Sequence, residues 1–233
     1  MKPFQFFKID SLVDLSVKRD TTVQLNFLEG STREPTLRFV PLNTLIAGRY
    51  QKIEIYHEIP TKKVGITTFI YDGVPQEIEF NKFLTPEKFN AYYDEKENVI
   101  LFCASKDTCK SAFKQLNRCF NFNLESIDFD FAKATDHIDN YMGAWFKGLS
   151  SELRAAALFG TSVEDNEHFK DFCVSGMISN AIIPFFNGGR MHQIMITKRS
   201  SVVLVDHYNN NDEVELKLLS DIYQEVIKPT WSN

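Results

Sequence analysis

Residues 177–208 decide the fold: MISNAIIPFFN (177–187), GG (188–189), RMHQIMIT (190–197), KRS (198–200) and SVVLVDHY (201–208). These are three strand-like, apolar runs separated by two short connections. Gly188-Gly189 supplies the positive φ angles that a tight hairpin requires. The stretch therefore predicts an antiparallel three-strand meander. Residues 214–227, followed by Pro229, predict a helix that closes the chain.

Upstream, a β-rich part precedes a part in which strands and helices alternate. In the first part, alternating apolar residues between turn signals predict strands over 22–28, 36–40, 51–57, 64–71 and 76–80. Turns are predicted at Pro60 and at Asp72-Gly73. Capping residues and apolar spacing predict helices over 85–94, 105–120, 132–147 and 162–172, and strands over 98–103, 126–131 and 154–159. The predicted class is α+β, with a β-rich part (1–80) and an α+β part (81–233) in one compact unit.

The composition excludes several classes of protein. The chain has 233 residues, 43% of them hydrophobic, and needs no metal or disulfide to fold. Its net charge of −5 argues against a surface that is basic throughout, although a local basic patch is compatible with it. The four cysteines form no C-x-x-C pair, which indicates free thiols in a reducing compartment. No apolar run approaches the ~18 residues of a membrane span, so we expect a cytoplasmic protein without membrane contact.

Motifs for cofactor and metal chemistry are absent from the sequence. It contains no G-x-x-x-x-G-K-[ST], no G-x-G-x-x-G and no G-x-S-x-G. It also contains no H-E-x-x-H and no paired C-x-x-C. We therefore expect no cofactor and no bound metal for the main interpretation.

One short segment bears on catalysis. Asp206 at the end of a predicted strand, followed by Glu215-Leu216-Lys217, resembles the metal-binding core of the PD-(D/E)XK nucleases. The resemblance implies two acids that hold Mg²⁺, which activates water, and a lysine that stabilises the developing charge. Glu215 and Lys217 depart from the family pattern because they open the predicted closing helix, where a spacing of two separates side chains. A solvent-exposed helix start is the alternative interpretation.

Two groups of basic residues are candidates for nucleic-acid contact. Arg190, His192, Lys198 and Arg199 belong to the last predicted hairpins. Lys110, Lys114 and Arg118 form a stripe at positions i, i+4 and i+8 of the helix over 105–120. Such residues contact phosphates without regard to base sequence. The alternative is an ordinary solvated helix surface.

The aromatic segment 141–146, YMGAWF, has two interpretations. Its side chains either pack in the core, or Trp145 and Phe146 are exposed and contact a protein partner, since tryptophan is a frequent interface anchor.

No family resemblance extends across the chain. The main hypothesis is a non-enzymatic cytosolic binding or regulatory protein that acts through contacts with a protein partner or within a homo-oligomer. A compact domain of this kind suits an accessory subunit of a bacterial stress or phage-defence system, with nucleic-acid contact. The alternative hypothesis is a divalent-metal-dependent nuclease.

Overall fold

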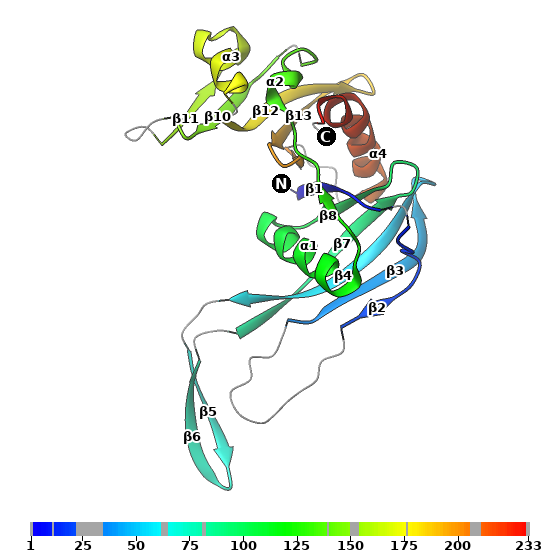
Figure 1. Cartoon of the computed structure of the whole chain (residues 1–233), viewed down its shortest axis with the longest axis vertical. Helices are drawn as coiled ribbons and strands as arrows, with labels where there is room; N and C mark the ends of the chain where they lie inside the picture. The colour runs from blue at the N-terminus through cyan, green and yellow to red at the C-terminus, as the bar shows by residue number, and fades with distance from the viewer. Residues whose placement is uncertain are drawn as a thin grey trace.

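The computed structural model describes residues 2–10, 12–21, 35–61, 65–80, 83–138, 140–149, 154–175, 177–205 and 211–231. Within them, twelve strands form one antiparallel sheet in the order β11-β10-β12-β13-β14-β1-β8-β7-β4-β3-β2, with β9 pairing beside β1 (Figure 1). The strands are β1 (Lys2–Lys8), β2 (Arg19–Asp20), β3 (Leu37–Ile46), β4 (Tyr50–Thr61), β7 (Phe83–Asp94), β8 (Val99–Cys103), β9 (Glu125–Ser126), β10 (Gly143–Lys147), β11 (Ala155–Phe159), β12 (Ile178–Asn187), β13 (Arg190–Thr197) and β14 (Ser201–Leu204).

Helices cover parts of both faces of this sheet. They are α1 (Lys106–Phe120), α2 (Phe131–Ala134), α3 (Glu167–Val174), α4 (Asp212–Ile222) and α5 (Lys228–Thr230), with a 3₁₀ turn at Val163–Asp165 and a π turn at Tyr223–Ile227 that joins α4 to α5. The predicted α+β class is confirmed. None of the described helices is long and apolar enough to cross a membrane.

The N-terminal strand β1 joins the two ends of the sheet. It pairs with β14 on one side and with β8 on the other, so Phe4 lies opposite Val202 and Phe6 opposite Leu101. Successive side chains of a strand point to opposite faces. Phe4 and Phe6 therefore enter one hydrophobic core and Phe7 enters the other.

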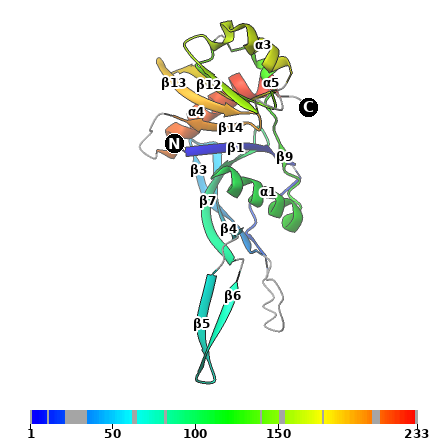
Figure 2. The same cartoon turned by 90° about the vertical axis from the view of Figure 1, so that its left-hand side faces the viewer.

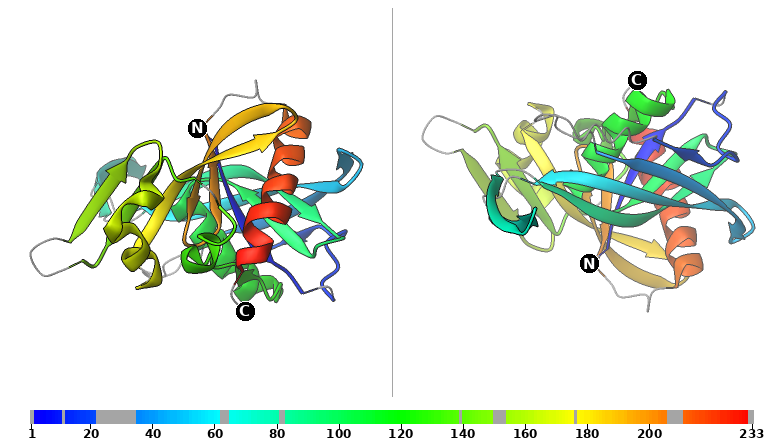
Figure 3. Two further views of the ribbon diagram at one scale, coloured as in Figure 1. Left: turned by 90° about the horizontal axis from the view of Figure 1, so that it is seen from above. Right: turned by 90° about the horizontal axis from the view of Figure 1, so that it is seen from below.

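The two cores define two faces of the sheet. On the α4 face, Leu216, Leu219 and Ile222 of α4 pack with Phe4 and Phe6, and α2 and α3 join the same core. In the view from above, the C-terminal helix crosses the strands in orange and red (Figure 3). On the α1 face, α1 packs over β1, β8, β7, β4 and β3. The strands from β14 to β11 lie beyond α1 on this face (Figure 2).

Local sequence explains α1. The Ser105 hydroxyl accepts a hydrogen bond from the Thr108 amide at the N-terminus, and Asn121 ends the helix in the left-handed conformation. Cys109, Ala112 and Leu116 form its buried stripe. The predicted helix over 105–120, the strands over 98–103 and 154–159, and the closing meander are confirmed.

The predicted helix over 85–94 is wrong, because these residues form β7. Phe89 and Ala91 alternate with outward residues and pack under α1, and the whole strand pairs with β4. At Pro86 the strand has β4 as its neighbour but not β8, which pairs only with Asn90–Asp94. A proline lacks an N–H and is tolerated at such an edge. The predicted turn at Pro60 is also wrong, because β4 continues to Thr61. The pairing of β4 with β3 ends at His57, so Pro60, like Pro86, lies where a strand has lost one of its neighbours.

The predicted helix over 132–147 is also wrong. Helix α2 has four residues, capped by the Asp130 carboxylate, and Gly143–Lys147 is strand β10, which pairs with both β11 and β12. The predicted strand over 126–131 is reduced to β9 and an isolated bridge at Phe129. In the segment predicted as a helix over 162–172, the α-helix begins only at Glu167, capped by Asn166. The strand predicted over 22–28 lies outside the described residues.

A two-stranded arm is inserted between β4 and β7. Its strands, β5 (Gly65–Tyr71) and β6 (Val74–Phe80), pair with each other and project from the body of the molecule (Figures 1 and 2). Asp72 and Gly73 make the predicted turn, both with positive φ. Because β7 pairs with β4 on the far side of this insertion, the residues before and after position 80 share one sheet.

Phe6→Ala tests the role of β1. Phe6 is 1% exposed and stacks on Tyr223. We expect a loss of about 3–5 kcal/mol in the free energy of unfolding, measured by urea denaturation, because the substitution leaves a cavity. Phe186→Ala is the control, since Phe186 is exposed, and should change the stability by less than about 1 kcal/mol. Equal effects of the two substitutions would contradict this role.

Candidate functional site

A cavity of about 610 Å³ lies on the α1 face of the sheet. It is beside the N-terminal turns of α1, over strands that extend beyond the helix. Its floor is built from residues of four adjacent strands, and those of β1, β14 and β13 alternate along each strand and point to the same face as Gln5 of β1. The floor residues are Pro3 and Gln5 of β1, Ser201 and Val203 of β14, Met195 and Thr197 of β13, and Ser179 and Asn180 of β12. The antiparallel register places these residues on one face, except for Ser179, which precedes Asn180 where the pairing of β12 with β10 shifts register.

Basic side chains from three separate segments surround this floor. They are Lys106 and Lys110 of α1, Lys147 of β10, and Lys198 and Arg199 of the turn between β13 and β14. Of the described residues that line the cavity with them, Asp128 is the one carboxylate. We call the cavity and these five residues the cationic groove. Among the described residues, Lys106, Lys110, Lys147 and Arg199 form no ion pair. Like charges converge here, and this arrangement favours an anionic ligand.

The turn that carries Lys198 and Arg199 is held by its backbone. The Lys198 amide donates to the Ser179 carbonyl at 3.0 Å, and the Lys198 carbonyl accepts from the Phe129 amide at 2.8 Å. The Ser201 amide donates to Thr197 Oγ1 at 3.1 Å, and Ser200 is buried with a positive φ. On the opposite wall, Lys106 and Lys110 are one helical turn apart in the capped first turns of α1. Both walls therefore present their charges from ordered backbone.

The structure brings together three of the predicted contact residues. Lys110, Lys198 and Arg199 line the groove, whereas Arg190, Lys114 and Arg118 are exposed outside its lining. His192 is buried on β13 with Ile194 and Ile196, facing the α4 core. Its prediction as a contact residue is wrong because alternation along β13 directs it away from the groove.

Sequence reasoning missed Lys106 and Lys147. Lys106 precedes Lys110 by four residues, so the helical spacing already used for Lys110, Lys114 and Arg118 could have found it. Lys147 had no such signal, because its segment was predicted to be helical and forms β10 instead.

The residues of the predicted nuclease site do not converge within the described chain. Glu215 is buried on α4 and Lys217 is exposed on the same helix, two positions later. Asp206 lies outside the described residues. The described residues contain no cluster of three or more His, Cys, Asp or Glu side chains that could hold a metal ion.

The two predicted partner-contact residues point to opposite faces of β10. Phe146 is buried and packs against Phe172 and Phe169, so its prediction as an exposed contact is wrong. Trp145 is partly exposed and packs edge-on against Phe159 of β11.

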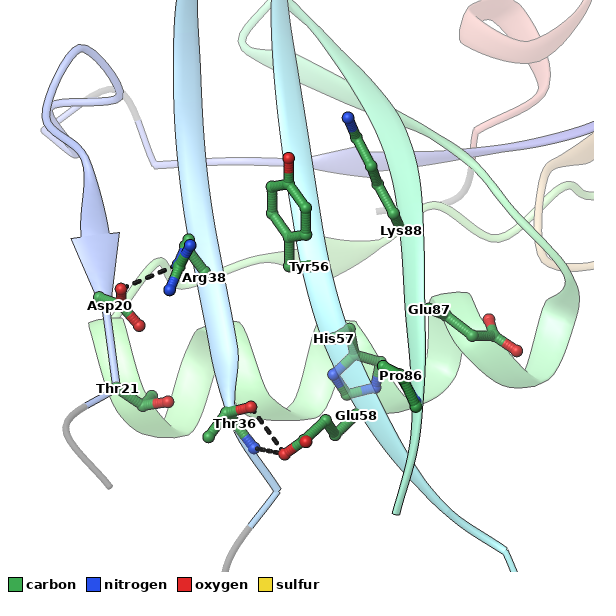
Figure 4. Close-up of a pocket in the computed structure, with 10 residues that line it drawn as sticks. All are labelled: Asp20, Thr21, Thr36, Arg38, Tyr56, His57, Glu58, Pro86, Glu87 and Lys88. Carbon is green, nitrogen blue, oxygen red and sulfur yellow. Dashed lines mark hydrogen bonds and ion pairs between the residues drawn. The ribbon is translucent and has the colours of Figure 1, made fainter. Parts of the chain in front are cut away.

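A second cavity, of about 690 Å³, lies at the lower ends of β2, β3, β4 and β7 (Figure 4). Its charged residues are paired within the protein. Arg38 bonds Asp20 at 2.9 Å, Lys88 bonds Glu54 at 2.6 Å, and Glu58 accepts from both the amide and the hydroxyl of Thr36. These pairs leave less charge for a ligand than the cationic groove does.

His57 is the unusual group of this second cavity. It is 2% exposed, on the α1 side of β4, and neither ring nitrogen has a hydrogen-bond partner in the described structure. Burial lowers the pKa of His57, and the Glu87 carboxylate, the nearby Gln115 side chain and the Glu58 carboxylate only partly oppose this effect. The imidazole is therefore neutral at pH 7.

No protein-family model and no curated protein matches the chain.

The depressed pKa of His57 predicts a pH dependence of stability. The unfolded chain binds a proton at His57 near pH 6.5 and the folded chain does not, so stability is lost as the pH falls below that value. Unfolding free energies measured from pH 7.5 to 5.5 should fall less steeply in His57→Leu, by at most about 1.4 kcal/mol per pH unit. His168→Gln, at an exposed position, is the control. An unchanged slope in His57→Leu would exclude this role.

Proposed function

We propose that this chain is a non-enzymatic binding protein whose cationic groove holds the phosphate backbone of a nucleic acid. The supporting observation is the convergence of Lys106, Lys110, Lys147, Lys198 and Arg199 around one cavity that has a single carboxylate among its described lining residues. We further propose, from the expectations drawn from sequence, that it works in the cytoplasm as a subunit or regulator with a protein partner.

The charge distribution supports a polyanionic ligand. The chain as a whole carries a net charge of −5, so the cations of the groove form a local positive region on an acidic protein. Lysine is a point charge on a flexible stem and binds phosphate without bidentate recognition of a base edge. Binding should therefore depend on the phosphate backbone and be insensitive to base sequence.

Charge reversal in the groove tests this proposal. We expect Lys198→Glu/Arg199→Glu and Lys110→Glu to weaken the binding of fluorescein-labelled oligonucleotides at least tenfold, measured by fluorescence anisotropy. The slope of log K against log[salt] should become less steep by about 0.7–0.9 for each phosphate contact that is lost.

Lys170→Glu provides the matched control, because Lys170 is exposed on α3, which packs on the α4 face. The control should bind like the native chain. Absence of oligonucleotide binding by the native chain at low salt, or equal weakening by Lys170→Glu, would refute the groove as the site.

A second candidate function, contact with another protein chain, is favoured by the β5–β6 arm. Ile66, Ile70, Tyr71 and Val74 are large apolar side chains exposed on this arm. Within the described part of the chain, the two strands pair only with each other, and an isolated hairpin is at best marginally stable in water. Exposed apolar side chains on a projecting element are typical of an interaction site.

Replacing residues 65–80 by a short glycine-serine turn tests this second candidate. We expect the native chain to form an oligomer and the shortened chain to be monomeric by light scattering, with oligonucleotide binding retained. A native chain that is monomeric and that captures no protein from its host would contradict it.

The metal-dependent nuclease stays a prediction from sequence. The burial of Glu215 and the exposure of Lys217 give it no support, and Asp206 lies outside the described residues. Divalent-dependent cleavage of DNA or RNA that is abolished by Asp206→Ala would establish it.

A further inference from the structure

An aromatic pair lies on the strands next to the cationic groove. The rings of Trp145 on β10 and Phe159 on β11 are edge to face, with centroids 5.1 Å apart and an interplanar angle of 87°. Trp145 is directly opposite Ala157, so Phe159 is its diagonal neighbour on the same face of the sheet. Phe159 is nevertheless 65% exposed.

The absence of a side chain at Gly143 leaves space for the Phe159 ring. Gly143 of β10 is the residue opposite Phe159, and a Cβ atom at position 143 would be 2.9 Å from Cδ1 of Phe159. The ring therefore lies in the space that a side chain at position 143 would occupy. Because Trp145 packs edge-on against the ring that Gly143 accommodates, a ligand that contacts the ring loses less conformational entropy than it would on a ring without such a neighbour.

The aromatic pair lies on the same face of the sheet as the cationic groove. Along β10, Trp145 and Lys147 point to one face and Phe146, between them, points into the core of the other. Trp145 and Lys147 are thus about 7 Å apart along the strand. Trp145 is also directly opposite Asn180, which lines the groove. The aromatic pair is therefore continuous with the groove through Lys147 and Asn180, on one face of the sheet.

Resting on the function proposed above, we infer that Trp145 and Phe159 form a base-stacking subsite and that the ligand is a single-stranded nucleic acid. Its phosphates contact the cationic groove while one or two bases stack on the aromatic pair. Aromatic side chains beside a basic groove are the general means of binding single strands, worth about 1–3 kcal/mol per base. In a duplex the bases are already stacked on one another and are not available to the pair.

Charge favours this ligand over an apolar protein surface. Lysine is depleted in protein–protein interfaces relative to the rest of the surface, whereas Lys147, one of the five cations of the groove, is two residues from Trp145 on the same strand. A nucleic acid satisfies both the cations and the aromatic rings.

Tryptophan fluorescence tests the stacking directly, because the chain has two tryptophans, Trp145 and Trp231. In Trp231→Phe the remaining signal comes from Trp145. Oligothymidylate of about 12 nucleotides, within the usual range of site sizes, should quench this signal. Inorganic polyphosphate, which has no bases, should compete for the groove without quenching. If Trp231→Phe fails to fold, the difference between the native chain and Trp145→Phe gives the same signal.

Phe159→Ala provides an independent measurement. We expect it to weaken oligothymidylate binding about 5- to 100-fold, the equivalent of one stacked base, and to leave polyphosphate binding unchanged. Gly143→Val should weaken oligothymidylate binding in the same direction by displacing the Phe159 ring. Tyr71→Ala is the matched control, since Tyr71 is a similarly exposed aromatic on the β5–β6 arm, and should bind like the native chain.

The outcomes separate this inference from the function on which it rests. If oligothymidylate and polyphosphate both bind but Trp145 is not quenched, or if a duplex binds as tightly as the single strand, the stacking subsite is overturned and the groove remains. If neither polyanion binds, the proposed function itself fails. A change in native mass in Phe159→Ala, with unchanged oligothymidylate affinity, would assign the pair to a protein contact and overturn the inference.

Discussion

The pairing of β1 with both β8 and β14 is the constraint on which the rest of the structure depends. Without it, the strands that follow β14 in the sheet would be separate from those that follow β8. Its alternating side chains place Phe4 and Phe6 in one core and Phe7 in the other, so a single strand supports both faces. The same alternation puts Pro3 and Gln5 on the floor of the cationic groove.

The groove exists because α1 covers only part of its face. The helix packs over the strands from β1 to β3, and the strands from β14 to β11 extend beyond it. Lysines of the helix and of the turn after β13 therefore line one cavity, beside the strands over which α1 does not pack. The second cavity is larger, but its cations Arg38 and Lys88 are paired with carboxylates, which is why the groove is the better candidate for an anionic ligand.

Sequence reasoning succeeded where local interactions decide the structure and failed where distant pairing does. The cap at Ser105 and the apolar stripe of α1 are local, as are the turns at Asp72-Gly73 and Gly188-Gly189. The segments 85–94 and 143–147 instead take the strand conformation because β4, β11 and β12 pair with them. A Thr-Pro helix start and helical spacing of aromatic residues are weaker than two complete ladders of backbone hydrogen bonds and a buried face.

The sequence by itself determined the α+β class, the closing meander, helix α1 and the basic character of Lys110, Lys198 and Arg199. Only the tertiary structure decided that these three residues meet Lys106 and Lys147, that His192 points into the core, and that Trp145 and Phe146 face opposite ways. Residue type and helix periodicity are properties of a short segment. The face to which a strand residue points, and the segment that it then approaches, depend on strand pairing between positions far apart in the chain.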